Sequence, residues 1–224
     1  MSESNPSWLL WQLADSAFPT GGFAHSGGLE AMMQAGEVNN AADLERFLRE
    51  CIHQAGWAFL PLANSAYDFP ELLPELDARC DAFLSNHVAN RASRVQGRAF
   101  ISACEKAFPI PSLLALADAC REQKSARHFA PLWGVVLKNL DVPRLEMQKL
   151  ALFLNLRGVL SAGVRLGLTG PFQAQQMQFR LAEEQQIVLE ECKDLTADSL
   201  AQVAPLLDLF QVAHDRLYSR LFQS

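Results

Sequence analysis

The chain contains 224 residues, of which half are hydrophobic and a fifth are charged, and its formal net charge is −6. A chain this apolar buries enough surface to fold, which excludes intrinsic disorder, and its negative charge gives no overall attraction to nucleic acid or to an anionic membrane. The longest stretch without a charged residue lies between Glu50 and Asp68 and contains polar residues and a proline, so no membrane-spanning helix is predicted.

The length favours one domain over residues 7–224, after a flexible tail over residues 1–6. Apolar residues recur mainly at helical spacing, and proline and glycine separate the segments. This pattern predicts helices over residues 8–13, 26–35, 41–59, 73–86, 90–107, 112–124, 128–140, 145–166 and 172–192, and a last stretch from Thr196 that is interrupted at Pro205. We expect N-caps at Ser7, Asn40, Asp141 and Thr196, a helix C-terminus at Gly36 and a kink at Pro61.

The segment over residues 145–166 has apolar residues on nearly every face, which is typical of a central buried helix. Its small residues are expected to let other helices approach closely; they are Gly158, Ser161, Ala162, Gly163 and Gly167. Neither an alternating strand pattern nor an internal repeat occurs. The sequence therefore predicts an all-α, single-domain helical bundle whose central hydrophobic helix is wrapped by the others.

The N-terminus and the cysteines together predict a cytoplasmic protein. The first six residues lack the basic start and apolar core of a secretory signal. The five cysteines are odd in number, widely spaced and without a Cys-x-x-Cys motif; they are Cys51, Cys80, Cys104, Cys120 and Cys192. We expect reduced thiols that pack as small hydrophobic side chains.

Motifs for catalysis and metal binding are scarce. The sequence contains no nucleotide-binding P-loop and no His-Glu-x-x-His pair, and its five histidines are scattered. The segment Ala24–Gly28 resembles the nucleophile elbow of α/β-hydrolases, with Ser26 as the nucleophile, but that motif needs a buried strand before it. Residues 18–22 do not suit a central strand because they contain a proline and two glycines. A serine hydrolase is therefore kept as the alternative function.

Four blocks of sequence closely resemble motifs of the UreF family of urease accessory proteins. The first runs from Leu13 to Glu30 around Pro19-Thr20-Gly21-Gly22-Phe23. The second is Ser93-Arg94-x-Gln96-Gly97-Arg98, and the third is Arg165-Leu166-Gly167 with Gly170 and Gln175. The fourth comprises Pro205–Asp208, His214, Tyr218–Phe222 and Ser224. The blocks follow the family's order through almost the whole chain.

This resemblance implies an all-helical dimer that binds the accessory protein UreD (UreH in some organisms) and the GTPase UreG. The assembly delivers nickel to apo-urease. A member of this family is a scaffold and a proposed regulator of the GTPase, and it is not known as an enzyme. We therefore expect no catalytic residue, no cofactor and no tightly bound metal in this chain. A helical chaperone that itself binds nickel is a weaker third possibility.

The first block is expected to form a loop that either shapes a partner surface or supports the first two helices. The loop residues singled out are Asp15, Ser16, Pro19, Gly21, Gly22, Phe23, His25, Ser26 and Glu30. The two adjacent glycines are expected to have positive φ. Asp15 and Ser16 are expected to anchor the loop and Glu30 to pair locally. Many relatives carry tyrosine at the position of His25, which favours an interface histidine over a nickel ligand.

Four arginines are candidates for a finger that acts on the GTPase in trans, namely Arg94, Arg98, Arg157 and Arg165. Arg157 and Arg165 lie eight residues apart, so they are expected to point the same way from the central helix. An arginine in so apolar a helix needs an acid or carbonyl partner, and a buried structural ion pair is the favoured interpretation. Our hypothesis is that none of the four is a true finger.

The C-terminal block is the preferred partner-binding segment. Arg216 and Arg220 are four residues apart and are expected to share one helical face. The neighbouring candidates are Tyr218, Ser219, Leu221, Phe222 and Ser224. An apolar, arginine-bearing terminus has the composition of a recognition segment. The resemblance associates this end with UreD.

Overall fold

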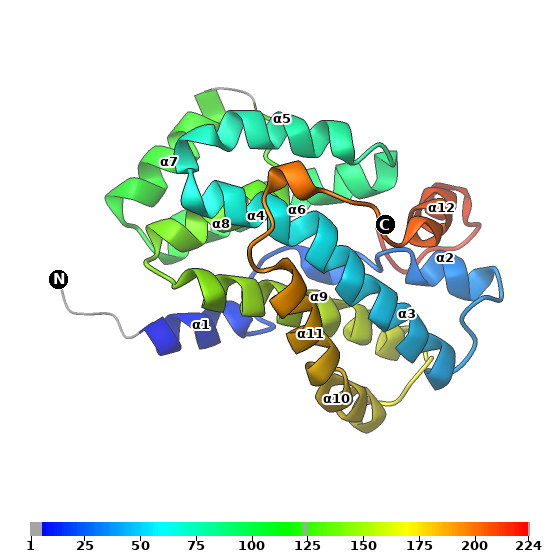
Figure 1. The fold of residues 1–224 in the computed structure, drawn as a ribbon. Helices are drawn as coiled ribbons and strands as arrows, with labels where there is room; N and C mark the ends of the chain where they lie inside the picture. The colour runs from blue at the N-terminus through cyan, green and yellow to red at the C-terminus, as the bar shows by residue number, and fades with distance from the viewer. Residues whose placement is uncertain (1–5, 123–124, 224) are drawn as a thin grey trace.

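The computed structural model describes residues 6–122 and 125–223, and every regular element in this part of the chain is helical. The helices are α1 (Pro6–Ala14), α2 (Leu29–Gln34), α3 (Ala41–Gln54), α4 (Leu60–Asp68), α5 (Leu73–Phe83), α6 (His87–Ala107), α7 (Pro111–Glu122), α8 (Phe129–Asn139), α9 (Arg144–Arg165), α10 (Pro171–Arg180), α11 (Ala182–Cys192) and α12 (Pro205–Ala213) (Figure 1). The predicted all-α, single-domain fold is confirmed. The predicted tail lies outside the described residues except for Pro6, which belongs to α1.

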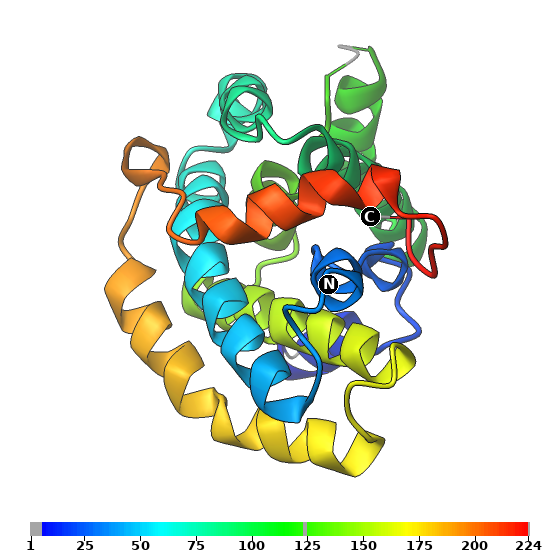
Figure 2. The same ribbon diagram turned by 90° about the vertical axis from the view of Figure 1, so that its right-hand side faces the viewer.

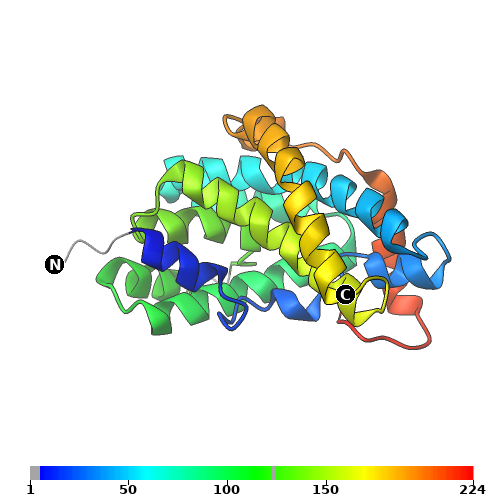
Figure 3. The same cartoon turned by 90° about the horizontal axis from the view of Figure 1, so that it is seen from below.

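Helix α9 runs through the middle of the bundle, with α1, α3, α10 and α11 packed around it (Figure 3). Met147, Leu156 and Leu160 on this helix are almost fully buried, which confirms the predicted central helix. A Cβ at Gly163 would lie 2.8 Å from Leu44 Cδ2, so this glycine permits the close approach of α3. By contrast, a Cβ at Gly158 would meet nothing within 4 Å, and the close approach expected there is wrong.

Helices α4 and α8 form a second close pair in the core. A Cβ at Gly134 would lie 2.1 Å from the Ala63 carbonyl oxygen, so the two backbones approach as only a glycine permits. Beside this contact, Trp133 packs against Phe100 with ring centroids 5.1 Å apart. The Trp133 indole N–H donates to the Met147 carbonyl at 3.2 Å, which satisfies its polar atom inside the core.

Several helix starts differ from their predicted positions. Asn40 caps α3 as expected, through bonds from the main-chain N–H groups of Ala42 and Asp43. Ser7 lies within α1 and does not precede it, so it is not the cap. Helix α2 begins three residues later than predicted because Gly27 and Gly28 have φ values of 63° and 92°, which no right-handed helix contains.

Asp141 ends α8 instead of capping α9, which corrects the prediction. Its φ is 55°, and its N–H donates to the Lys138 carbonyl at 3.1 Å. A single residue in the left-handed conformation commonly ends a right-handed helix in this way. The helix predicted to kink at Pro61 changes earlier, through a π-helical turn over Ala55–Phe59. Pro61 itself lies in the first turn of α4. The glutamine-rich helix breaks at Leu181, where a bend buries this side chain fully and lets both α10 and α11 contact α9.

The chain after α11 is less helical than predicted. Thr196 precedes the short turn Ala197–Ser199 but makes no side-chain capping bond, which corrects the prediction, and the Ala197 N–H donates to Ser65 Oγ. Pro205 opens α12 and does not interrupt a helix, since proline is tolerated in the first turn. Helix α12 then lies beside α2 and α6 (Figure 2).

The five cysteines are buried and free, in keeping with the predicted packing as small hydrophobic side chains. Burial raises the pKa of the Cys80 and Cys104 thiols to about 12 in each case. Among the described residues, no helix combines the length and apolarity that a membrane crossing needs.

Candidate functional site

The loop between α1 and α2, residues 15–28, packs against α6 and α9. Asp15 starts it, because its Oδ1 accepts a hydrogen bond from the Ala17 N–H at 2.8 Å. Gly21 has a φ of 76°, and a Cβ there would lie 3.2 Å from Ala99 Cβ on α6. Gly21 therefore has the expected positive φ, whereas Gly22 does not, and that part of the prediction is wrong.

A cavity of about 510 Å³ lies between this loop and α9. Loop residues from Ser16 to Gly27 line one side, and α9 around Gly158 lines another. Trp133 of the core and Gln96 of the second family block complete the lining. The loop therefore covers the cavity without filling it, and the absence of a side chain at Gly158 enlarges the cavity.

Two arginines of α9 bind main-chain carbonyls of this segment, one at the end of α1 and one within the loop. Arg157 donates to the carbonyl of Ala14, and Arg165 donates to the carbonyl of Phe23 at 2.7 Å. The Arg165 guanidinium also lies over the rings of Phe23 and Phe222, 3.8 and 4.1 Å from their centroids. Both arginines reach the same segment, as expected, but neither pairs with a carboxylate of the described residues. The predicted buried ion pair is wrong, because carbonyl and aromatic groups replace the acid.

Glu30 binds the C-terminal segment. Its buried carboxylate accepts hydrogen bonds from the main-chain N–H groups of Leu221 and Phe222, at 2.6 and 3.2 Å. It also lies 3.2 Å from Nε2 of His214, whose side chain is fully buried. The prediction that Glu30 pairs locally is wrong, since its partners are about 190 residues away along the chain.

Two further bonds hold the C-terminal segment against the loop and α2. The Gln223 N–H donates to the Ala24 carbonyl at 2.8 Å, and the Gln34 side-chain amide donates to the Ser219 carbonyl at 3.0 Å. The end of the chain therefore lies beside α2 and α12 (Figure 1).

The predicted partner-binding residues divide into a buried and an exposed set. Phe222 is only 5% exposed, whereas the exposed side chains are Arg216, Tyr218, Ser219, Arg220 and Leu221. Ser224 lies outside the described residues. The shared helical face expected for Arg216 and Arg220 is wrong: α12 ends at Ala213, and an extended segment follows a short turn. Burial of His214 and Phe222 on either side of residues 215–221 accounts for this path.

His25 and Ser26 lie where the loop meets α2. Burial, together with the charges of Arg91 and His214, lowers the pKa of His25 to about 4. His25 is therefore neutral at neutral pH. Ser26 is fully buried, with its Oγ 3.5 Å from the Glu30 N–H. Because the described residues contain no strand and the hydroxyl is enclosed, no observation favours the hydrolase alternative.

The second family block has an inward and an outward side on α6. Ser93 Oγ accepts the Phe129 N–H at 3.2 Å and lies 3.1 Å from His128 Nδ1. A Cβ at Gly97 would lie 1.9 Å from the Arg127 carbonyl oxygen. These two inward positions hold the segment that leads into α8, whereas Arg94 and Arg98 line an open groove.

His128 and Asp77 are central residues that sequence reasoning missed. His128 Nε2 lies 3.0 Å from Asp81 Oδ1, so Ser93, His128 and Asp81 have the residue types of a hydrolytic triad. The imidazole is fully buried, however, and the serine hydroxyl already accepts the N–H of Phe129. The contacts therefore fix the start of α8.

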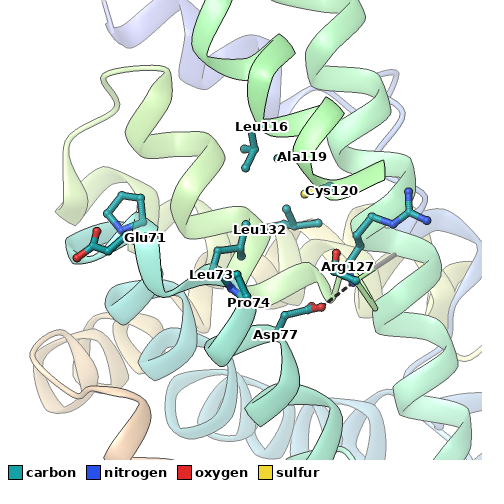
Figure 4. A pocket seen from close by; sticks show the side chains of 11 residues that line it. Glu71, Leu73, Pro74, Asp77, Leu116, Ala119, Cys120, Arg127 and Leu132 are labelled. Carbon is teal, nitrogen blue, oxygen red and sulfur yellow. Dashed lines mark hydrogen bonds between the residues drawn. The ribbon is translucent and has the colours of Figure 1, made fainter. Parts of the chain in front are cut away.

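Asp77 lines a separate hollow of about 200 Å³ between α5 and α7 (Figure 4). Its buried carboxylate accepts hydrogen bonds from the main-chain N–H groups of Arg127 and His128, at 3.0 and 2.7 Å. One feature of the sequence could have identified Asp77: it lies on the same helix face as the apolar residues Leu76 and Cys80. An acid on a buried face needs hydrogen-bond donors inside the protein.

Helix α10 carries the rest of the third block. Gly170 directly precedes it, and Gln175 is exposed on its surface. Phe172 and Phe179 on this helix are 86% and 84% exposed. Among the described residues, no three histidine, cysteine or acidic side chains cluster closely enough to hold a metal ion.

Comparison with known proteins shows which family this chain resembles. A family model described as UreF matches residues 38–182. Urease accessory protein F of Arabidopsis thaliana is 39% identical over 221 residues, which cover 97% of this chain and 92% of the plant protein. The protein of the same name from Oryza sativa subsp. indica is 36% identical over 96% of this chain and 84% of its own length. Urease accessory protein UreF of Mycobacterium tuberculosis is 30% identical over 96% of this chain and 98% of its own length.

Proposed function

The chain belongs to the UreF family of urease accessory proteins, and on this premise we propose that it acts in the cytoplasm as a non-enzymatic scaffold of urease maturation. In this proposal it binds UreD and the GTPase UreG, regulates GTP hydrolysis, and the assembly delivers nickel to apo-urease. Nickel is the cargo of the assembly, and this chain holds no cofactor of its own.

The proposal is carried by one observation: residues of three family blocks meet where the C-terminal segment contacts the loop. Glu30 comes from the first block, Arg165 from the third, and His214 and Phe222 from the fourth, and all four are joined by the bonds and ring contacts above. Three large apolar side chains beside this junction are exposed, namely Phe23, Tyr218 and Leu221, and we call them the terminal surface. Its aromatic and aliphatic composition supports UreD as its partner.

Our hypothesis remains that none of the four candidate arginines is an arginine finger, and the bonding of the two α9 arginines supports it for Arg157 and Arg165. Arg157 and Arg165 each donate a hydrogen bond to a main-chain carbonyl of the same chain. The direct test is the rate of GTP hydrolysis by UreG in complexes that carry charge-conserving Arg→Lys changes. Loss of hydrolysis in an intact complex would contradict the hypothesis.

Helix α10 supports the homodimer. Phe172 and Phe179 are seven residues apart, about two helical turns, so both project from one side of α10. Two exposed aromatic side chains on one helix face are typical anchors of an interface. Light scattering on the purified chain, with and without Phe172→Ser and Phe179→Ser, tests whether this face joins two copies.

Co-purification tests the scaffold role as a whole. Tagged chain, expressed with UreD, UreG and apo-urease, is expected to capture all three proteins. A chain that captures none of them would contradict the proposal.

A further inference from the structure

Arg94 and Arg98, on the outward side of the second family block, have no evident role in holding the helices together. Ser93 and Gly97 hold the segment before α8, but Arg94 and Arg98 form no ion pair with any carboxylate of the described residues. They line an open groove of about 620 Å³ beside α6. Arg91, which lines the same groove, is paired with Asp215, whereas within the described part of the chain Arg94 and Arg98 are not paired, although the protein has a net charge of −6.

A third arginine adds positive charge next to the pair. Because Gly97 admits the Arg127 carbonyl against α6, Arg127 lies close to Arg98. Burial lowers the pKa of Arg98, and the charges of Arg127 and Arg94 lower it further. Folding therefore places like charges together, and the local repulsion is relieved when an anion binds between them.

The nearby acid does not neutralise Arg127. Asp77 bonds to the main-chain N–H of Arg127, and the guanidinium extends away from that carboxylate (Figure 4). Asp77 thereby holds Arg127 at a φ of 62°, a conformation that non-glycine residues adopt at a cost. The Arg127 Nε is buried without a hydrogen-bond partner. Arg127 lines the hollow between α5 and α7 and not the groove itself, so its effect on the groove is the positive charge that it adds near Arg98.

We propose that Arg94 and Arg98 bind a carboxylate on an acidic segment of a partner protein. A single guanidinium binds both oxygens of a carboxylate with paired hydrogen bonds, and a second arginine one helical turn away adds positive charge in the same groove. The groove also contains Asp81, and Asp215 pairs with Arg91 and His87 at its other side. These acids repel an extended polyanion such as RNA. The charge of Arg94 contributes to the lowered pKa of Asp81, whereas the charges that act on Arg98 are those of two arginines, so Arg98 is the stronger attractor of a carboxylate.

The test uses the full chain and a fluorescein-labelled hexaglutamate peptide, with binding followed by anisotropy at low salt. The wild type is expected to bind the peptide, and Arg94→Gln with Arg98→Gln to weaken binding by about tenfold or more. Arg94→Lys with Arg98→Lys is expected to lose several-fold, because it keeps the charge without the paired geometry. The matched control is Arg46→Gln, a charge loss on α3, which is expected to bind like the wild type.

Three outcomes would overturn the proposal. The first is a wild type that does not bind hexaglutamate, and the second is a folded double glutamine variant that binds it as well as the wild type. The third is a wild type that binds inorganic phosphate or a short RNA more tightly than the peptide, which would assign the arginines to phosphate. Circular dichroism confirms that each variant is folded. Because no other accessory protein is present in the test, none of these failures bears on the role in urease maturation.

Discussion

Glu30 and His214 lie 3.2 Å apart inside the protein, although 184 residues separate them along the chain. The same carboxylate accepts the N–H groups of Leu221 and Phe222. One buried acid therefore anchors the chain at three points between His214 and Phe222.

The first prediction concerns this carboxylate. Glu30→Ala leaves buried donors without an acceptor, and we expect it to lower the free energy of unfolding by about 3–5 kcal/mol. Urea unfolding measures the loss, and hydrogen exchange over residues 217–223 is expected to accelerate. Glu71→Ala, which removes an exposed carboxylate, is the control and is expected to change stability by less than about 0.5 kcal/mol. Equal losses in the two variants would contradict the role given to Glu30.

The second prediction concerns pH and His25. The folded protein holds the pKa of His25 at about 4, chiefly through burial, below the ordinary value of 6.5. Between these two values the unfolded chain binds a proton that the folded protein does not. The contribution of His25 to stability is therefore complete above pH 6.5 and is lost as the pH falls toward 4.

Urea unfolding from pH 7 to pH 4 tests this dependence. His25→Gln is expected to lose less stability than the wild type over that range, because it has no group to protonate. Parallel curves for the two proteins would show that His25 is not held neutral.

The third prediction separates two glycines. A Cβ at Gly97 would lie 1.9 Å from a main-chain oxygen, so Gly97→Ala is expected to destabilise the protein by about 3 kcal/mol or more. Gly158→Ala enters open space in the middle of α9 and is expected to stabilise it by up to about 1 kcal/mol. Thermal or urea unfolding decides, and a tolerated alanine at position 97 would contradict the contact with Arg127.

The fourth prediction concerns the terminal surface. Tyr218→Ala with Leu221→Ala is expected to reduce capture of UreD by about tenfold or more, because these side chains are exposed and free to act as anchors. Their removal leaves the contacts of Glu30 and Phe222 in place, so helical content is expected to be unchanged. Leu145→Ala with Ile187→Ala removes exposed apolar side chains from α9 and α11 and serves as the control. Undiminished capture by the first variant would place UreD elsewhere.

Helical periodicity predicted most of the fold, because the spacing of apolar residues within each segment identifies the face that is buried. Asn40 was recognisable as a cap for the same reason, since a cap acts within three residues. The expected cap at Asp141 is wrong because an aspartate two residues before Pro143 suits the N-cap of a helix as well as the single left-handed residue that ends one. The break at Leu181 depends on tertiary packing, to which helix propensity is a weak guide.

The candidate site was predictable only in its residues, not in its contacts. The family blocks identified Glu30, Arg165, His214 and Phe222 individually, but their convergence depends on the path of the whole chain. The expected ion pair of Arg165 failed because Phe23 and Phe222 present ring faces and a carbonyl that satisfy a guanidinium without an acid. No local pattern distinguishes these alternatives.

The most direct test of the central claim is the activation of apo-urease by nickel in the presence of UreD, UreG, GTP and bicarbonate. With this chain added, urease activity is expected to appear, and without it to stay near the background. Equal activation in the two mixtures would contradict the role of this protein in urease maturation.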